Sequence, residues 1–157
     1  DVIGLSQRGG TIWGSVKMGE KIHSPNIAPG DADILIAFEK LESKRWKHML
    51  KQKDSIAIIN EYEIAPTLVQ QGDKEYPEDV LDNMKQKSEV ISLDATATGA
   101  KMGNPAIANI LLLGIAARYM DISVETWFKT FEQYLPAKFV ELNKKAFMYG
   151  YEQEYLK

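Results

Sequence analysis

Few residues in this chain have the types and spacing that catalysis or metal binding requires. The sequence contains no cysteine and two histidines, His23 and His48, which lie far apart. It therefore has no thiolate nucleophile, no cysteine ligands for zinc or an iron–sulfur cluster, and no histidine pair with metal-ligand spacing. A Ser–His–Asp arrangement, a phosphate-binding loop and the G-x-G-x-x-G fingerprint are also missing from it. The residues predict neither a catalytic constellation nor a metal site.

The most suggestive polar segment is Gln7-Arg8-Gly9-Gly10. Two consecutive glycines let the backbone approach a ligand closely, and the guanidinium of Arg8 can pair with a phosphate or carboxylate through two hydrogen bonds. A surface turn that carries an arginine would have the same residues. The sequence alone therefore fits both an anion-binding element and a plain turn.

Three further candidates lie where strands end or helices begin. Ligands of open parallel sheets bind outside the carboxyl ends of the strands. At that edge we expect Glu39, Asn60-Glu61 and the hydroxyl-rich loop 94–99, with Thr96. Asn104 precedes Pro105 and predicts a helix start whose free N–H groups suit an anion. An ordinary strand-to-helix connector and a well-capped helix would explain the same residues.

The elements that would position these side chains are those of an α/β domain. Three short apolar runs are typical of parallel strands that are covered on both faces. Helical patterns around residues 46–50 and 78–87 separate them, and this alternation predicts a Rossmann-like, open, mostly parallel sheet with flanking helices. The runs span residues 33–38, 55–60 and 89–94.

The regions around this unit predict other elements. Alternating residues 11–18, followed by the Gly19-Glu20 pair and a return to His23, predict an N-terminal β-hairpin. Residues 64–76 alternate loosely, which we interpret as an excursion or small hairpin off the sheet. The C-terminal third predicts helices, which cover residues 107–120 and begin near residues 124 and 136.

One of the predicted helices is too apolar for the cover that the other predicted elements offer. The run 107–120 is apolar all round, and a doubly wound sheet needs a first strand and helix that the sequence does not supply before residue 11. We therefore interpret residues 1–157 as a single domain that lacks its first strand and helix. We expect an exposed apolar face near Leu111 or Ile115, or its coverage by another chain.

Composition narrows the function classes. The chain has 157 residues, of which 45% are hydrophobic and 26% charged, and a net charge of -3. This balance predicts a soluble globular protein with no electrostatic attraction to nucleic acid or to an anionic membrane. The apolar run 107–120 is shorter than the roughly 20 residues of a membrane span. The absence of cysteine fits a cytoplasmic protein.

Several segments together resemble one known family. Gly4-Leu5-Ser6-Gln7-Arg8-Gly9-Gly10 is similar to the G-M-[SA]-Q-R-G-G signature of the γ-type catalytic domain of pyruvate/2-oxoacid:ferredoxin oxidoreductases. Further segments follow in the family's order over essentially the whole chain, and the resemblance is closest to the β subunit of the indolepyruvate enzymes. The matching segments are residues 23–27, 30–33, 37–42, 76–77, 94–96, 103–105 and 141–147.

The resemblance implies a subunit of a larger enzyme. Such enzymes decarboxylate a 2-oxoacid oxidatively with thiamine diphosphate and coenzyme A, and they pass electrons through iron–sulfur clusters to ferredoxin. The thiamine diphosphate and the clusters belong to larger partner subunits, so this chain is expected to bind no cofactor and to be inactive alone. A homodimer is compatible with this role. The resemblance and the positions at strand ends and helix starts together give the residues expected to contact a ligand such as coenzyme A, or a partner: Gln7, Arg8, Gly9, Gly10, Ser24, Asn60, Thr96 and Asn104.

Two other functions fit the sequence. One is a free-standing α/β module that binds a small molecule or nucleotide, although the glycine fingerprint of such modules is missing. The other is a scaffold that only makes subunit contacts. Coenzyme A binding by the isolated chain would argue against the scaffold, and association with a thiamine-diphosphate subunit would argue against the free-standing module.

Overall fold

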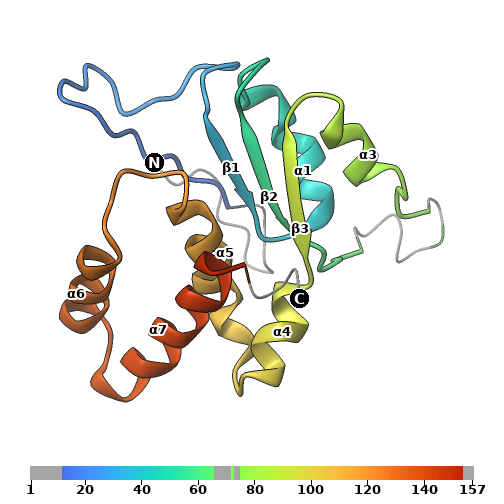
Figure 1. Ribbon diagram of the computed structural model, residues 1–157. Coiled ribbons are helices and arrows are strands. Elements are labelled where there is room, and N and C mark those ends of the chain that lie inside the picture. The colour runs from blue at the N-terminus through green and yellow to red at the C-terminus, as the bar shows by residue number, and fades with distance from the viewer. Residues whose placement is uncertain (1–11, 66–71, 73–74, 154–157) are drawn as a thin grey trace.

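A computed structural model describes residues 12–65, 72 and 75–153, and it shows an open α/β sheet with helices on both faces (Figure 1). The three strands are parallel, in the order β1-β2-β3. The strands are β1 (Ile34–Ala37), β2 (Ile56–Asn60) and β3 (Glu89–Leu93). The helices are α1 (Lys40–Trp46), α3 (Val80–Lys85), α4 (Ala95–Lys101), α5 (Ala108–Ala117), α6 (Val124–Tyr134) and α7 (Ala137–Tyr151), with 3₁₀ turns η1 (Lys47–Met49) and η2 (Pro105–Ile107).

The apolar strands are covered on both faces, as their sequences predict. Along β2, Ile58 packs into a cluster with Leu111 and Leu112 of α5. Its neighbour Ile59 points the other way, into a cluster with Met84 of α3. Because successive side chains of a strand point to opposite faces, two packed faces require a continuous apolar run. The predicted strands, the parallel sheet and the intervening helices are confirmed.

Cover for the apolar helix α5 comes from the C-terminal helix. Leu111 and Ile115 are both 0% exposed, and α7 packs along α5 (Figure 1). The two helices touch through their backbones, since a Cβ built on Gly114 would lie 2.1 Å from the carbonyl oxygen of Phe147. One built on Gly150 would lie 2.2 Å from the carbonyl oxygen of Leu111. The expectation of an exposed apolar face near Leu111 and Ile115 was therefore wrong, because the sheet buries part of α5 and two glycines let α7 come close enough to cover more of it.

An aromatic cluster closes the outer side of this helical layer. Helix α6 begins at Ser123, whose hydroxyl accepts a hydrogen bond from the Thr126 amide. Its Phe131 is 5% exposed and meets Phe147 of α7 edge-on, with ring centroids 5.6 Å apart. Trp127 adds a second ring against Phe147. None of the helices described is long and apolar enough to cross a membrane.

The N-terminal hairpin is not formed. Residues 12–31 contain no strand beyond the single bridge residue Trp13, although residues 12–18 alternate as a strand does. The apolar members of the alternation stay in solvent, with Val16 80% and Met18 60% exposed. A two-stranded hairpin is marginal without a layer that buries one of its faces, and the part of the chain that the structure describes supplies no such layer. The segment instead meets the domain through Trp13, whose ring lies edge-on to Trp46 at 5.0 Å.

Most of the predicted excursion at residues 64–76 lies outside the described residues.

Candidate functional site

The carboxyl ends of the three strands meet at one edge of the sheet, where Asn60 joins them. Its side chain is 3% exposed. Its amide nitrogen donates to the Phe38 carbonyl at 3.1 Å and to the Thr96 hydroxyl at 2.9 Å. Its amide oxygen accepts from the Ala95 amide at 2.9 Å. One neutral side chain thus ties the end of β1 and the start of α4 to the end of β2.

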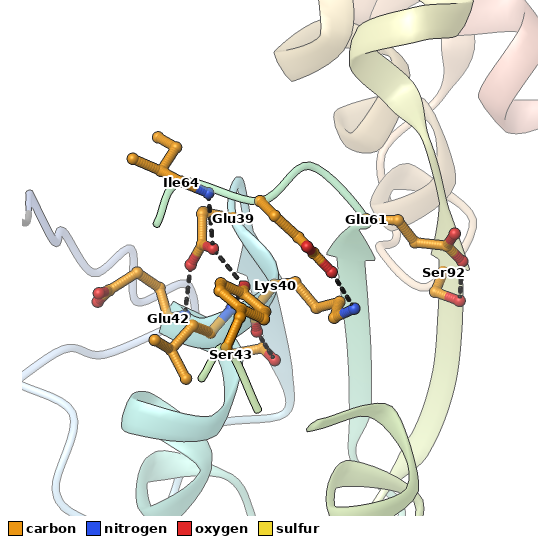
Figure 2. Close-up of polar contacts among 10 residues, drawn as sticks. Glu39, Lys40, Glu42, Ser43, Glu61, Ile64 and Ser92 are labelled. Atoms are coloured by element: carbon orange, nitrogen blue, oxygen red, sulfur yellow. Dashed lines mark hydrogen bonds and ion pairs between the residues drawn. The ribbon is translucent and has the colours of Figure 1, made fainter. Parts of the chain in front are cut away.

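A second buried polar residue, Glu39, lies one residue beyond Phe38 at the same edge. It is 8% exposed and caps α1, accepting from the Glu42 amide at 2.9 Å. Its other carboxylate oxygen accepts from the Ile64 amide at 3.2 Å and from the Tyr76 hydroxyl at 2.6 Å. Figure 2 shows the Ile64 and Glu42 segments converging on this carboxylate. Glu39 therefore joins α1 to two segments that follow it in the chain by more than twenty residues.

Tyr76 completes the Glu39 cluster. Its hydroxyl donates to Glu39 and accepts from the Leu41 amide at 3.0 Å, and the ammonium group of Lys40 lies 5.5 Å from the centre of its ring. Burial, and then the hydrogen bond to the Glu39 carboxylate and its negative charge, raise the pKa of Tyr76 well above its ordinary value. The phenol consequently stays a neutral donor at physiological pH.

Charged side chains line the outside of this edge (Figure 2). Glu61 follows β2 and accepts a hydrogen bond from the Ser92 hydroxyl at 2.7 Å. Glu63 pairs with the ammonium group of Lys40. Asp94 follows β3 and caps α4, accepting from the Ala97 amide at 2.7 Å. The edge thus has a polar, well-bonded interior and an acidic exterior.

The structure brings some of the sequence-predicted residues together. Asn60 and Thr96 lie side by side, as their places at the carboxyl ends predicted. Asn104 caps η2, because its side chain accepts from the Ala106 amide at 2.9 Å. The hydroxyl of Ser24 accepts from the Asn26 amide at 3.2 Å in the irregular N-terminal segment. The segment Gln7-Arg8-Gly9-Gly10 lies outside the described residues.

Sequence reasoning placed Glu39 at this edge but did not find the cluster of hydrogen bonds around it. The position of Glu39 at the end of an apolar run was a signal, because it places a carboxylate at the binding edge of a parallel sheet. Tyr76 lies in a segment that resembles the family, but nothing in that segment indicated its partner, because Tyr76 lies 37 residues from Glu39 and the two meet only once the chain is folded.

The buried polar side chains of this edge contact one another and the backbone around them. The polar groups of Asn60 and Glu39 are engaged in hydrogen bonds within the domain. Among the described residues, no three side chains of His, Cys, Asp or Glu are grouped so that they could hold a metal ion. A shallow hollow lies at the opposite edge, near the amino ends of β2 and β3, and is lined by residues 54–56 and 85–89. It contains none of the residues of the Asn60 and Glu39 clusters.

The fold and this edge define an α/β domain whose parallel sheet ends in a network of polar contacts. The chain belongs to the pyruvate ferredoxin/flavodoxin oxidoreductase family, whose sequence pattern matches residues 1–153.

Individual relatives support this assignment to the family. The chain is 30% identical to the indolepyruvate oxidoreductase subunit IorB of Archaeoglobus fulgidus, over 96% of this chain and 76% of the relative. It is 29% identical to the protein of the same name from Thermococcus kodakarensis, over 96% of this chain and 77% of that one. Both matches extend over nearly the whole chain.

Solved structures share the fold. The gamma subunit of the keto/oxoacid ferredoxin oxidoreductase of Geobacter sulfurreducens superposes with a TM-score of 0.59 at 22% identity, over 82% of this chain and 67% of that one. The pyruvate oxidoreductase subunit PORC of Thermotoga maritima gives a TM-score of 0.57 at 20% identity, over 82% of this chain and 66% of that one. The family match and the structure thus confirm two expectations from the sequence, the family and the α/β fold.

Proposed function

We propose that the chain is the small subunit of an indolepyruvate-type 2-oxoacid:ferredoxin oxidoreductase, and that it acts only in complex with a larger subunit. The observation that carries this proposal is the match with indolepyruvate oxidoreductase subunits over 96% of the chain. The oxidoreductase class follows from the family, and the indolepyruvate substrate follows from the names of these relatives.

The donor set of the chain supports a division of labour between subunits. Iron–sulfur clusters are held by cysteine thiolates, and this chain has no cysteine. Its residues therefore do not fit a cluster, and we assign electron transfer to the partner. We assign thiamine diphosphate to the partner as well. Coenzyme A, whose phosphates suit an arginine and two glycines, is assigned to the segment Arg8-Gly9-Gly10 of this chain.

Reconstitution tests the proposal. The chain and the thiamine-diphosphate subunit encoded in the same genome are purified separately, and the reduction of ferredoxin by indolepyruvate and coenzyme A is measured. We expect turnover from the mixture and none from this chain alone. Turnover by either polypeptide alone, at the rate of the mixture, would contradict the proposal.

Arg8→Ala tests the assignment of coenzyme A. Loss of charge-assisted hydrogen bonds of this kind costs about 1.5–3 kcal/mol, so the KM for coenzyme A should rise by about tenfold or more. The control is Arg45→Ala, which removes an exposed arginine that pairs with Glu42 on α1. An unchanged KM for the Arg8 variant, with normal complex formation, would remove Arg8 from the coenzyme A site.

The scaffold function makes a different prediction. A scaffold would restore full activity to the larger subunit without any affinity of its own for coenzyme A. Titration calorimetry of the isolated chain with coenzyme A separates the two functions.

A further inference from the structure

Three large apolar side chains are exposed at the carboxyl edge of the sheet. Phe38 is 57% exposed, Tyr62 46% and Ile64 58%, and we call these residues the carboxyl-edge patch. They lie on adjacent segments, since the Lys40 amide donates to the Tyr62 carbonyl at 3.1 Å and Asn60 holds the Phe38 carbonyl. Isolated exposed apolar residues are ordinary, but several on neighbouring segments mark an interaction site.

The backbone beneath the patch is fixed by buried polar bonds. Glu39, next to Phe38, accepts from the Ile64 amide, and Tyr76 holds the same carboxylate in place (Figure 2). Fixing a loop costs conformational entropy, which is usually offset by burial of the loop's side chains. Here the side chains of Phe38 and Ile64 remain in solvent. An ordered apolar surface of this kind lowers the entropic cost of binding a partner.

The charges around the patch indicate the chemistry of that partner. Glu61, Glu63 and Asp94 are exposed along the same edge. A cation, Lys40, lies at the same edge. Its side chain is 16% exposed and already pairs with Glu63. The described part of the edge therefore has an excess of negative charge. Its complement is an apolar surface ringed by lysine and arginine.

We propose that the carboxyl-edge patch is the docking surface for the larger subunit, and that the larger subunit presents apolar side chains with a basic rim. This inference rests on the proposed function. A second copy of this chain fits less well, because a two-fold contact of the patch with itself would bring the carboxylates of the two copies together.

Binding of the purified thiamine-diphosphate subunit tests the apolar part of the proposal. We expect Phe38→Ser and Ile64→Ser to raise the Kd by about tenfold or more, because they remove apolar contacts at the centre of the interface. The control is Tyr134→Ser on α6, which removes a side chain that is 73% exposed away from the patch and should leave the Kd unchanged. Circular dichroism verifies that each variant is folded.

Charge-neutralising variants test the acidic rim. Glu61→Gln keeps an acceptor for Ser92, and Asp94→Asn keeps the cap of α4. Both should slow association several-fold and reduce its dependence on salt, because rim charges act mainly on the association rate. Glu141→Gln, at a carboxylate on α7 whose side chain is 87% exposed, is the matched control.

The outcomes separate this inference from the proposed function. If the wild-type chain does not bind the larger subunit, both are wrong. If it binds and the Phe38 and Ile64 variants bind equally well, the docking surface lies elsewhere and only this inference is overturned. If sedimentation shows a wild-type homodimer that Phe38→Ser dissociates, the patch is a contact between copies, and this inference is overturned as well.

Discussion

The helical layer and the carboxyl edge of the sheet are both tightly packed, but different interactions stabilise them. Where α5 meets α7, backbones touch at Gly114 and Gly150 and apolar side chains fill the remaining space. At the carboxyl edge, the buried side chains of Asn60 and Glu39 hold the segments by directed hydrogen bonds. A close steric contact is disrupted when an atom is added, whereas a hydrogen-bonded contact is disrupted when a donor or an acceptor is removed. The two regions should therefore respond to different substitutions.

The largest expected effect is that of one methyl group in the helical layer. Gly150→Ala places a Cβ 2.2 Å from the Leu111 carbonyl oxygen, so α7 must move away from α5. We expect the free energy of unfolding to fall by about 3 kcal/mol or more. The control, Gly19→Ala, has no atom within 4 Å of the added Cβ and should change little. Similar denaturant midpoints for the two variants would show that the helices are not in steric contact.

The next largest effect is expected at Asn60, the neutral side chain that joins the strand ends. Asn60→Ala removes three hydrogen bonds and leaves the buried Ala95 amide without its partner. We expect a loss of about 2–3 kcal/mol in the free energy of unfolding, measured by urea denaturation. Asn109→Ala, at an exposed asparagine on α5, should cost much less. Equal losses for the two variants would mean that Asn60 does not join the strand ends.

A smaller effect is expected at Glu39, the buried carboxylate of the same edge. Glu39→Gln keeps one acceptor but turns an amide donor toward groups that themselves donate, the amides of Glu42 and Ile64 and the hydroxyl of Tyr76. We expect a loss of about 1–2 kcal/mol in the free energy of unfolding. The same change at the exposed Glu61 is the control. A Glu39→Gln variant as stable as the wild type would show that the carboxylate charge is not needed there.

The smallest effect at neutral pH, and the most diagnostic, belongs to Tyr76. Tyr76→Phe removes the donor to Glu39 and the acceptor of the Leu41 amide, and should cost about 1 kcal/mol in the free energy of unfolding at pH 7. This difference from the wild type should depend on pH. Burial, together with the hydrogen bond and charge of Glu39, raises the folded-state pKa of Tyr76 above its ordinary value of 10.0.

The sign of this dependence follows from linkage. Because the folded-state pKa is raised, the contribution of Tyr76 is complete below pH about 10 and is lost as pH rises from there through the folded-state pKa. The stability difference between wild type and Tyr76→Phe should therefore be constant from pH 7 to about 9 and shrink above about 10. Urea denaturation at each pH measures it. A difference that stays constant to higher pH would contradict the raised folded-state pKa of Tyr76.

The sequence allowed much of the sheet to be predicted, because each element carries a local signal. Continuous apolar runs such as residues 55–60 indicate strands covered on both faces, and the order of elements indicates parallel pairing. The hairpin over residues 11–23 was wrong because alternation predicts a strand only if a layer exists to bury its apolar face. The cover of α5 was missed because Gly114 and Gly150 gain their meaning only when the two helices pack together.

The candidate site could be predicted in part. The adjacency of Asn60 and Thr96 followed from topology, since parallel strands end at one edge. Their role as a structural tie could not be predicted, because it depends on the Phe38 carbonyl and the Ala95 amide, which only the folded chain brings to Asn60. The Glu39 cluster could not be predicted, because no sequence signal paired Tyr76 with Glu39, 37 residues away.

The tryptophans give this protein a separate optical signal for two of its parts. Trp127 lies in the aromatic cluster of the helical layer, and its indole nitrogen is buried with no hydrogen-bond partner among the described residues. Trp13 and Trp46 lie in edge-on contact where the N-terminal segment meets α1. Release of that segment should abolish the near-ultraviolet dichroism of the coupled pair, while the short-wavelength fluorescence of Trp127 persists until the helices separate. Spectroscopy on the unmodified chain can thus time the two events independently, without an added label.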